Sequence, residues 1–374
     1  MKGELLFYSD FPFGFHNTEA EEKMARFAAR GWQVTYVEQL GIRNPRPRHV
    51  LRALRARRSP SRAARTVPYD VVSPKLIPPR RAPGVDGLNR RWLSRQLLGR
   101  VTAPRTTVLW VRFPTPELVS LAVAEPWQAV VYEVVDDHAA GPGMTDRLRV
   151  VFGEAEERLI ARADVVFAWS EPIRERLALR HPNVRLATAA VDVEELKPVA
   201  DVEGEERTAV FAGELGFRFD EELAAGVAEL LPDWELVFAG PAGEEAAGAL
   251  ASLPNVRLTG RFDRVELPLL LGRSRVCLVP YRVNAFNDML VPVKLVEYLA
   301  AGRPVVSTPM RGAEEFADAV AFADGAEAFA DAVLAAARDD SPQERHRRVE
   351  RARPFSWERR IDEMEAAIEE AMGG

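Results

Sequence analysis

Residues 287–309, NDMLVPVKLVEYLAAGRPVVSTP, contain a lysine in an unusual place. The segment predicts a helix over about residues 292–301 that ends at Gly302, because proline is tolerated in a first helical turn and glycine commonly follows the last. Lys294 then lies beside the positive end of the helix dipole, with Glu297 three residues later, which is the less favourable order for an ion pair. Helix N-termini bind anions, and a bound anion would make Lys294 its counter-ion. The alternative is a solvated ion pair of little energetic value.

Asp136, Asp137 and His138 follow one another at the end of the apolar run AVVYEVV. At least one of the two carboxylates must lie at the edge of the sheet. There it could act as a general base that takes the proton of a hydroxyl group in an inverting displacement. Asp137 is the first choice for this base. The alternative is that one aspartate caps the next helix, near Thr145, and the other binds loop amides. His16, in the loop after the first strand, is a further candidate for this base or for binding the compound that carries the hydroxyl group, or is polar surface.

A loop with two glycines, AGELGFRFD, separates an apolar run from the helix expected near Asp220. Gly213 and Gly216, with Glu214 between them, would let the backbone approach a phosphate closely, although such a loop is often only a turn. Gly240 and Tyr281 follow the next apolar runs. Both residues could lie beside a nucleobase. The alternative is that Gly240 is part of a tight turn and that Tyr281 lies at the edge of the core.

Short apolar runs alternate with longer amphipathic ones along the whole chain, which predicts parallel strands joined by helices. In the first half the strands are expected in ELLFYS, QVTYVE, YDVVSP, TVLWVR, AVVYEVV and DVVFAWS, and in the second half in TAVFAG, WELVFAG, NVRLTG, VCLVPY and PVVSTP. The prediction is two doubly wound α/β domains joined by residues 197–207.

Composition narrows the class of protein. The chain has 374 residues, a formal net charge of −6 and one cysteine, Cys277, so neither an intrachain disulfide nor a cysteine-based zinc site is expected. No run of about eighteen apolar residues occurs, and the N-terminus predicts a strand rather than a signal peptide. We therefore expect a cytoplasmic protein, with no nucleic acid as partner.

Basic residues are concentrated in the first half, with eighteen Lys and Arg against two acids between Arg43 and Arg112. Residues 43–67 contain no acid. We expect this segment to dock on an anionic surface, and the first choice is the inner face of a membrane that holds a hydroxyl-bearing substrate. A solvated face or a polyanionic soluble acceptor are the alternatives. The arginines expected to make the contact are Arg52, Arg55, Arg57 and Arg58.

Residues 292–309, PVKLVEYLAAGRPVVSTP, resemble the nucleotide-sugar motif of GT-B glycosyltransferases, in the superfamily of glycosyltransferase family 4 and glycosyl transferases group 1. FAGELGFRFD is similar to the first strand and loop of that family's donor domain, AAVDVEELKP to its linker, and FSWERRIDEM to its closing helix. The resemblance implies an acceptor-binding domain over 1–196, a donor domain over 208–353, and a C-terminal helix over 354–374 that packs back toward the first domain.

The resemblance also implies roles for single residues. Lys294 would pair with the donor diphosphate, Glu297 would accept hydrogen bonds from ribose hydroxyls, and Arg218 would be a second cation on the diphosphate. Retaining members commonly have a second glutamate eight residues before the first, where this chain has Met289. No metal or other cofactor is implied for the bond-making step.

The predicted function is transfer of a sugar, most simply a hexose from a UDP or GDP sugar, to a hydroxyl of a glycan, a lipid-linked acceptor or a natural product. The alternative is an epimerase or another nucleotide-sugar enzyme with the same two-domain fold. A third possibility is a protein of this fold that binds its ligand without catalysing a reaction. The large basic surface favours transfer, because an epimerase needs no acceptor surface.

Overall fold

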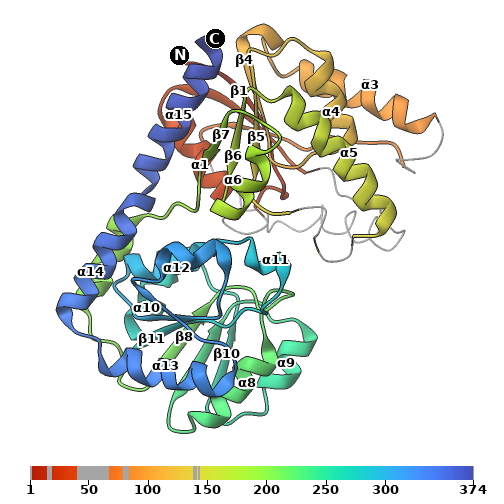
Figure 1. Cartoon of the computed structure of the whole chain (residues 1–374). Coiled ribbons are helices and arrows are strands. Elements are labelled where there is room, and N and C mark those ends of the chain that lie inside the picture. The colour runs from red at the N-terminus through yellow and green to blue at the C-terminus, as the bar shows by residue number, and fades with distance from the viewer. Residues whose placement is uncertain are drawn as a thin grey trace. The chain divides into compact units, whose positions relative to one another are not determined.

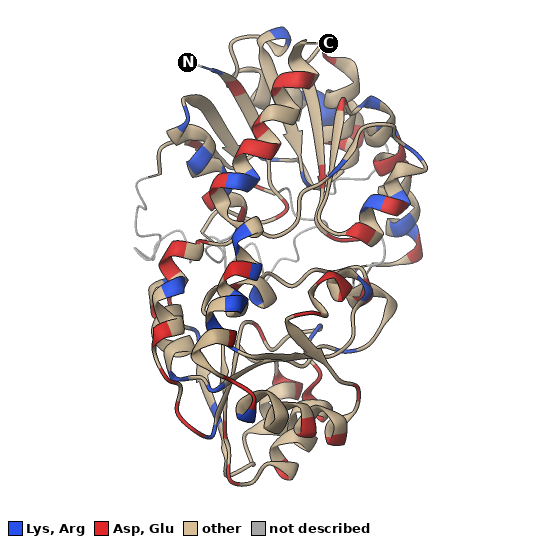
Figure 2. Cartoon of the chain, turned by 60° about the vertical axis from the view of Figure 1, so that its left-hand side comes forward, with Lys and Arg blue, Asp and Glu red and all other residues tan. Residues whose placement is uncertain are grey.

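The computed structural model describes residues 2–14, 19–39, 67–78, 84–137, 141 and 144–373. The chain divides into two compact units (Figure 1). The first contains residues 1–168, 173–186 and 361–374, and the second contains residues 169–172 and 187–360. Acidic and basic residues occur along the ribbons of both units (Figure 2).

The first unit is built on a seven-stranded parallel sheet of order β3-β2-β1-β4-β5-β6-β7. Its elements, in chain order to the last strand of the sheet, are β1 (Gly3–Tyr8), α1 (Glu19–Ala29), β2 (Trp32–Val37), β3 (Asp70–Val72), α3 (Val85–Leu98), η1 (Pro104–Thr106), β4 (Thr107–Val111), α4 (Pro116–Ala124), β5 (Ala129–Val134), α5 (Asp146–Arg162), β6 (Val165–Ala168), α6 (Glu171–Ala178) and β7 (Val184–Leu186).

The second unit is built on a six-stranded parallel sheet of order β10-β9-β8-β11-β12-β13. The remaining elements are α7 (Val193–Leu196), η2 (Lys197–Asp201), β8 (Thr208–Ala212), α8 (Glu221–Leu230), β9 (Glu235–Ala239), α9 (Glu244–Leu250), β10 (Val256–Gly260), η3 (Arg264–Glu266), α10 (Leu267–Arg273), β11 (Val276–Val279), α11 (Ala285–Asp288), α12 (Val293–Ala300), β12 (Val305–Ser307), η4 (Arg311–Phe316), β13 (Val320–Phe322), α13 (Ala326–Arg338), α14 (Pro342–Ala352), η5 (Arg353–Phe355) and α15 (Trp357–Gly373).

The two parallel sheets confirm the predicted fold class. Every predicted strand run contains a strand, and the central strands β4, β5, β8 and β11 are buried along their whole length, as strands covered on both faces should be. Two strands, β7 and β13, are absent from the predicted runs. Each is an edge strand of three residues, too short to carry a periodic signal.

Each sheet has one place where the strand order reverses. The chain runs outward from β1 to β3 and returns to β4 beside β1, and in the second unit it runs outward from β8 to β10 and returns to β11 beside β8. Doubly wound sheets bind ligands at the carboxyl ends of the strands next to such a reversal. The residues that follow β1, β4, β8 and β11 are therefore the first places to look for a site.

Hydrogen bonds and ion pairs fix η2 and the end of α15, the two segments near the predicted domain borders. Arg303 is fully buried and its Nη2 donates to the carbonyl oxygens of Val199, Val202 and Gly272, which ties η2 to the second unit. The end of α15 belongs to the first unit, where Glu365 accepts hydrogen bonds from Trp32 Nε1 at 2.7 Å and Arg30 Nη1 at 3.1 Å and forms an ion pair with Lys2. In the described part of the chain, no helix is both long and apolar enough to cross a membrane.

Candidate active site

Lys294 lies in the first turn of α12, as the sequence predicts. Pro292 is the N-cap of this helix, and the helix ends before Gly302, whose φ of 70° lies in the left-handed region that glycine adopts readily. The ammonium Nζ of Lys294 donates to Tyr281 Oη at 2.5 Å. It also lies 5.1 Å from the ring centroid of Phe211 and 4.9 Å from that of Tyr281, which is cation–π distance.

No carboxylate of the described residues lies within ion-pair distance of Lys294. Its charge is therefore held by two rings, a hydroxyl and solvent, at the positive end of a helix. An ammonium in such surroundings gains from a bound anion, because the anion supplies the opposite charge that the protein does not.

The glycine loop after β8 lies against this lysine. A Cβ added to Gly213 would be 2.9 Å from Lys294 Cε, and a Cβ added to Gly240 would be 1.8 Å from the carbonyl oxygen of Gly213. Gly240 also has a φ of 149°, so the loop after β9 can approach the backbone of Gly213 this closely only because residue 240 is glycine. The structure thus brings Gly213, Gly240, Tyr281 and Lys294 together at the β8–β11 reversal. Glu214 and Gly216 belong to the same loop, with Glu214 exposed.

Arg218 is held in a fixed position at the end of the same loop. Its guanidinium lies 4.5 Å from the ring centroid of Phe286 and 5.1 Å from that of Phe217, and its Nη1 donates to Asn287 Oδ1 at 3.1 Å. Asn287 is 1% exposed and donates in turn to the carbonyl oxygen of Arg282 at 2.8 Å. Residue 287 therefore positions a cation, which its sequence context did not reveal.

Glu297 is nearly buried, and its Oε1 accepts a hydrogen bond from Arg264 Nη1. Arg264 is the first residue of η3, which follows β10, and its side chain is one-third exposed. Arg264 is not among the residues predicted from the sequence. The only signal for it is an arginine in the loop after a strand, TGRFDR, which many surface loops share. The structure places this arginine on the carboxylate that the resemblance assigns to the ribose.

Met289 and Asp288 are occupied by backbone contacts. The carbonyl oxygen of Met289 accepts from Ser170 Oγ at 2.6 Å, and Asp288 Oδ1 accepts from the backbone N–H of Arg311 at 2.8 Å. Residue 289, where retaining members of the resembled family have a second glutamate, therefore has a thioether side chain, and its backbone carbonyl oxygen already accepts a hydrogen bond.

Asp136 and Asp137 follow β5 in the first unit and are partly exposed. Asp137 Oδ2 lies 3.4 Å from Arg176 Nη1, and the side chain of Asp137 is 25% exposed. The N-cap of α5 is Thr145, whose hydroxyl accepts from the Leu148 N–H at 3.4 Å. The capping role considered for the aspartates thus belongs to Thr145.

Several predicted residues lie outside the described part of the chain. They are His16, Arg52, Arg55, Arg57, Arg58 and His138.

A buried ionic cluster at the β1–β4 reversal was not predicted. Glu133 is fully buried, accepts from Lys23 Nζ and from Trp110 Nε1 at 2.9 Å, and lies 3.7 Å from Arg112 Nε. Burial raises the pKa of Glu133, but the charges of Lys23 and Arg112 outweigh it and the pKa lies below its usual value. Two further carboxylates complete the cluster, with Arg112 3.0 Å from Glu19 and 3.5 Å from Asp10.

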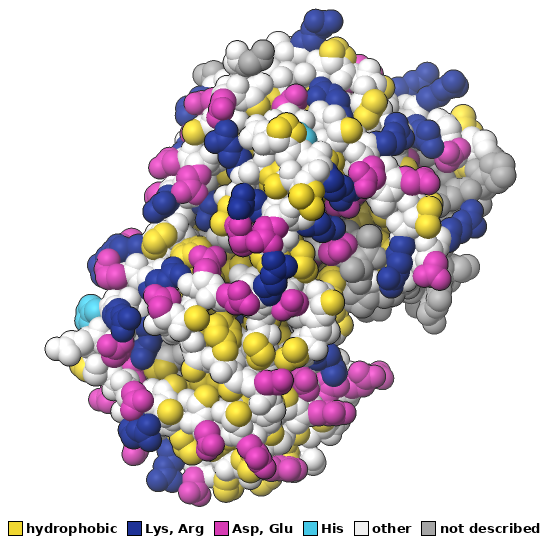
Figure 3. Space-filling model, in the orientation of Figure 1, with side chains coloured by type: hydrophobic (Ala, Val, Ile, Leu, Met, Phe, Trp, Pro, Cys, Tyr) yellow, Lys and Arg dark blue, Asp and Glu magenta, His cyan; other side chains and the backbone are white. Residues whose placement is uncertain are grey.

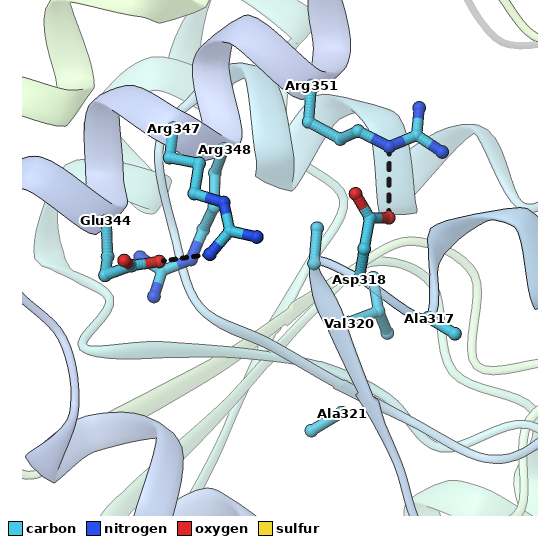
Figure 4. Close-up of a pocket in the computed structure, with 9 residues that line it drawn as sticks. Ala317, Asp318, Val320, Ala321, Glu344, Arg347, Arg348 and Arg351 are labelled. Atoms are coloured by element: carbon cyan, nitrogen blue, oxygen red, sulfur yellow. Dashed lines mark hydrogen bonds and ion pairs between the residues drawn. The ribbon is translucent and has the colours of Figure 1, made fainter.

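A pocket of about 470 Å³ opens elsewhere in the second unit, between β13 and α14 (Figure 4). None of the predicted donor residues lines it. Its arginines already have carboxylate partners, since Arg351 Nε donates to Asp318 at 3.1 Å and Arg348 Nη1 to Asp340 at 2.6 Å. We therefore do not assign the donor site to it. Among the described residues no group of three or more His, Cys, Asp or Glu is placed to hold a metal ion.

Residues 206–339, which contain the Lys294 site, match the family model of Glycosyl transferases group 1. A curated relative is the glycosyltransferase TuaH of Bacillus subtilis (strain 168), whose role in teichuronic acid biosynthesis is provisional. It is 31% identical over 219 residues, which cover 54% of this chain and 55% of TuaH. The match therefore spans about half of each protein.

Solved structures resemble the chain over nearly its whole length. Sucrose-phosphate synthase from Thermosynechococcus elongatus has a TM-score of 0.73 at 16% identity and covers 99% of both chains. Anabaena Alr3699/HepE, solved with UDP and glucose, has a TM-score of 0.69 at 14% identity and covers 97% of this chain and 98% of its own. At these identities the likeness shows the fold, which is the GT-B fold.

Proposed function

We propose that this chain, a GT-B-fold protein whose residues 206–339 belong to the Glycosyl transferases group 1 family, transfers a sugar from a nucleoside diphosphate sugar to a hydroxyl acceptor. The observation that carries the proposal is Lys294, a cation without a carboxylate partner among the described residues, at the N-terminus of α12 and against the glycine loop. A diphosphate has the charge and the acceptor oxygens that this arrangement lacks.

Each donor residue has a proposed role. Lys294 and Arg218 neutralise the diphosphate and stabilise the negative charge that grows on it as the sugar leaves, so the reaction needs no metal ion. Glu297 accepts hydrogen bonds from the ribose, with Arg264 holding its carboxylate. Gly213 and Gly240 keep the backbone close enough to contact phosphate, and Tyr281 holds the ammonium of Lys294 in place.

The donor we propose first is a UDP-hexose, because Alr3699/HepE has been solved with UDP and with UDP-glucose. A GDP sugar is the alternative. The acceptor we propose is a hydroxyl of a glycan, supported by the likeness to the teichuronic acid biosynthesis glycosyltransferase TuaH. Asp137, at the carboxyl end of β5, is the proposed general base, with Asp136, His138 and His16 as the alternatives.

The test begins with ligand binding. UDP, GDP and the other nucleoside diphosphates are screened for stabilisation against heat, since a ligand that binds only the folded state raises the melting temperature. Nucleotide sugars of the best base are then screened for release of the nucleoside diphosphate, with and without glycan acceptors. The proposal predicts stabilisation by one base and slow release that an acceptor accelerates. It is wrong if no nucleoside diphosphate stabilises the protein, and conversion of the sugar without release would indicate an epimerase.

A further inference from the structure

The outer face of α3 carries large apolar side chains in a strongly basic surrounding. Leu88 and Trp92 are 54% and 47% exposed, and they lie one helical turn apart. Arg91 and Arg95 share their stripe of the helix, at the i, i+3, i+4 and i+7 spacing from Leu88. The opposite face of α3, with Asn89, Leu93 and Leu97, is buried, so packing within the first unit does not need the outer face.

A neighbouring segment adds to this face. Asn89 exchanges two hydrogen bonds with the backbone of Ile77, at 2.7 and 2.9 Å, and Gln96 exchanges two with the backbone of Lys75, at 3.0 and 2.9 Å. These bonds fix residues 75–77 along α3. Ile77 is 45% exposed, so a third apolar side chain and a further cation stand beside the helix. We call the set the α3 face, and its members are Lys75, Ile77, Leu88, Arg91, Trp92 and Arg95.

The charge of the α3 face is not compensated locally. The acid in α3, Asp86, pairs with Arg90 at 3.0 Å, and no Asp or Glu occurs between residues 87 and 116. In the part of the chain that the structure describes, no carboxylate lies within ion-pair distance of Arg91 or Arg95. Figure 3 shows several basic side chains on this part of the first unit, with hydrophobic and acidic side chains between them.

From this combination we propose that the α3 face docks on an anionic lipid membrane. Arginines attract the face to anionic headgroups, while tryptophan and leucine enter the boundary between headgroups and acyl chains, where an amphipathic indole is most stable. A soluble polyanion would use the arginines but would leave three apolar side chains in water. All residues of the α3 face belong to the first unit, and membrane docking by this face does not depend on sugar transfer.

The six other tryptophans of the chain are less than 10% exposed, which makes Trp92 a specific reporter. The full chain is mixed with vesicles of phosphatidylcholine alone or of phosphatidylcholine with phosphatidylglycerol, at low and at physiological salt. We expect sedimentation with the anionic vesicles only, weaker at the higher salt because salt screens exposed charges. The tryptophan emission should shift to shorter wavelength and be quenched by lipids brominated in the acyl chain. In Trp92→Phe both signals should disappear while sedimentation persists.

Two double variants separate the contributions of charge and apolar contact. Arg91→Gln with Arg95→Gln should lower partitioning into anionic vesicles at low salt by roughly tenfold or more. Leu88→Ser with Trp92→Ser should lower it by about tenfold. The control variants lie in the second unit, where Arg338→Gln with Arg347→Gln and Val265→Ser with Leu269→Ser change exposed arginines and exposed apolar side chains and should leave partitioning unchanged.

Three outcomes would overturn the proposal. The wild type could ignore anionic vesicles at low salt, whether or not it binds a soluble polyanion such as heparin. It could sediment without any change in tryptophan emission, which would place the docking surface elsewhere. The α3 double variants could partition like their controls. Melting temperatures close to that of the wild type would show that each variant is folded.

Discussion

The reversal points of the two sheets differ in how their charges are compensated. At the β1–β4 reversal of the first unit, Lys23 and Arg112 face Glu133 and two further carboxylates, and these groups are largely buried. At the β8–β11 reversal of the second unit, Lys294 faces aromatic rings, a hydroxyl and the backbone of a glycine loop. The folds are alike, but the first site supplies its own counter-charges, whereas the described residues supply none to Lys294 at the second.

From this difference we expect the first site to be structural and propose that the second binds a ligand. Buried charges that pair with one another keep the fold intact, because removal of one leaves the others unpaired in a medium of low dielectric. A partly exposed cation with no acidic partner contributes little to folding and is available to an anion. Substitutions at the first site should therefore act on stability, and those at the second on affinity.

The largest expected effect is on catalysis, at the end of the strand that carries Glu133. Asp137→Asn should lower turnover by about 10²–10⁴-fold, because an amide cannot accept the proton of the acceptor hydroxyl. Nucleotide affinity should not change, since this side chain belongs to the first unit. The measurements are steady-state transfer and calorimetric titration with the nucleoside diphosphate.

Asp136→Asn is the matched control for this variant, as it changes the neighbouring carboxylate. If Asp137→Asn is fully active, the base is Asp136, His138 or His16, and full activity in all four single variants would exclude this part of the first unit from proton transfer.

Glu133→Gln should lower the free energy of unfolding by about 3–5 kcal/mol, because Lys23 and Arg112 then lose a buried counter-charge. Urea unfolding measures the change, and Glu154→Gln, an exposed residue of α5, is the control. Nucleotide affinity should stay the same in the folded variant. A change below about 1 kcal/mol would mean that the cluster adjusts to the loss, and the proposed division of roles would then fail.

The effect of Glu133→Gln on the free energy of unfolding should depend on pH. The pKa of Glu133 is lowered on folding, from a usual value of 4.5. Its ionised form therefore stabilises the fold fully above about pH 4.5, and this contribution is lost as the pH falls through the lower folded-state value. The difference in unfolding free energy between wild type and Glu133→Gln should be constant near neutral pH and narrow in acid. A difference that widens in acid would contradict the lowered pKa.

In contrast to Glu133→Gln, Lys294→Ala should lower the affinity for the nucleotide and change the stability of the fold little. The loss of one charge-assisted contact to the diphosphate is worth about 1.5–3 kcal/mol, or roughly ten- to a hundredfold in the dissociation constant. The free energy of unfolding should change by at most about 2 kcal/mol, since one hydrogen bond to Tyr281 and two cation–π contacts of a partly exposed side chain are removed. Titration calorimetry tests the affinity, with Lys197→Ala, an exposed lysine of the second unit, as control. An unchanged dissociation constant would remove the diphosphate from this helix.

The sequence alone predicts the fold and several residues that the structure brings together in the candidate site. Lys294, Gly213 and Tyr281 lie at or near element ends, where apolar runs stop, and periodicity locates such ends well. Glu133 and Arg264 could not be found in this way. A glutamate inside the apolar run AVVYEVV gives no sign of partners on β4 and α1, and the contact of Arg264 with Glu297 joins residues 33 positions apart. Contacts of this kind are set by tertiary packing, which a single sequence does not encode locally.

The smallest expected effect concerns the pair of Arg264 and Glu297. Since the arginine side chain is one-third exposed, its ion pair is worth at most about 1 kcal/mol, so Arg264→Gln should weaken nucleotide binding by no more than roughly fivefold. Glu297→Gln should act differently, because the carboxylate itself is the proposed ribose contact. Titrations with UDP and 2′-deoxy-UDP separate the two roles.

Wild type and Arg264→Gln should both prefer the ribonucleotide, because Glu297 is still present in each. In Glu297→Gln the preference should shrink, since a neutral amide accepts a weaker hydrogen bond than a carboxylate does. Loss of all nucleotide binding in Arg264→Gln would show that the guanidinium contacts the ligand directly. An undiminished preference for ribose in Glu297→Gln would take the ribose away from this carboxylate and leave Lys294 as the residue that defines the site.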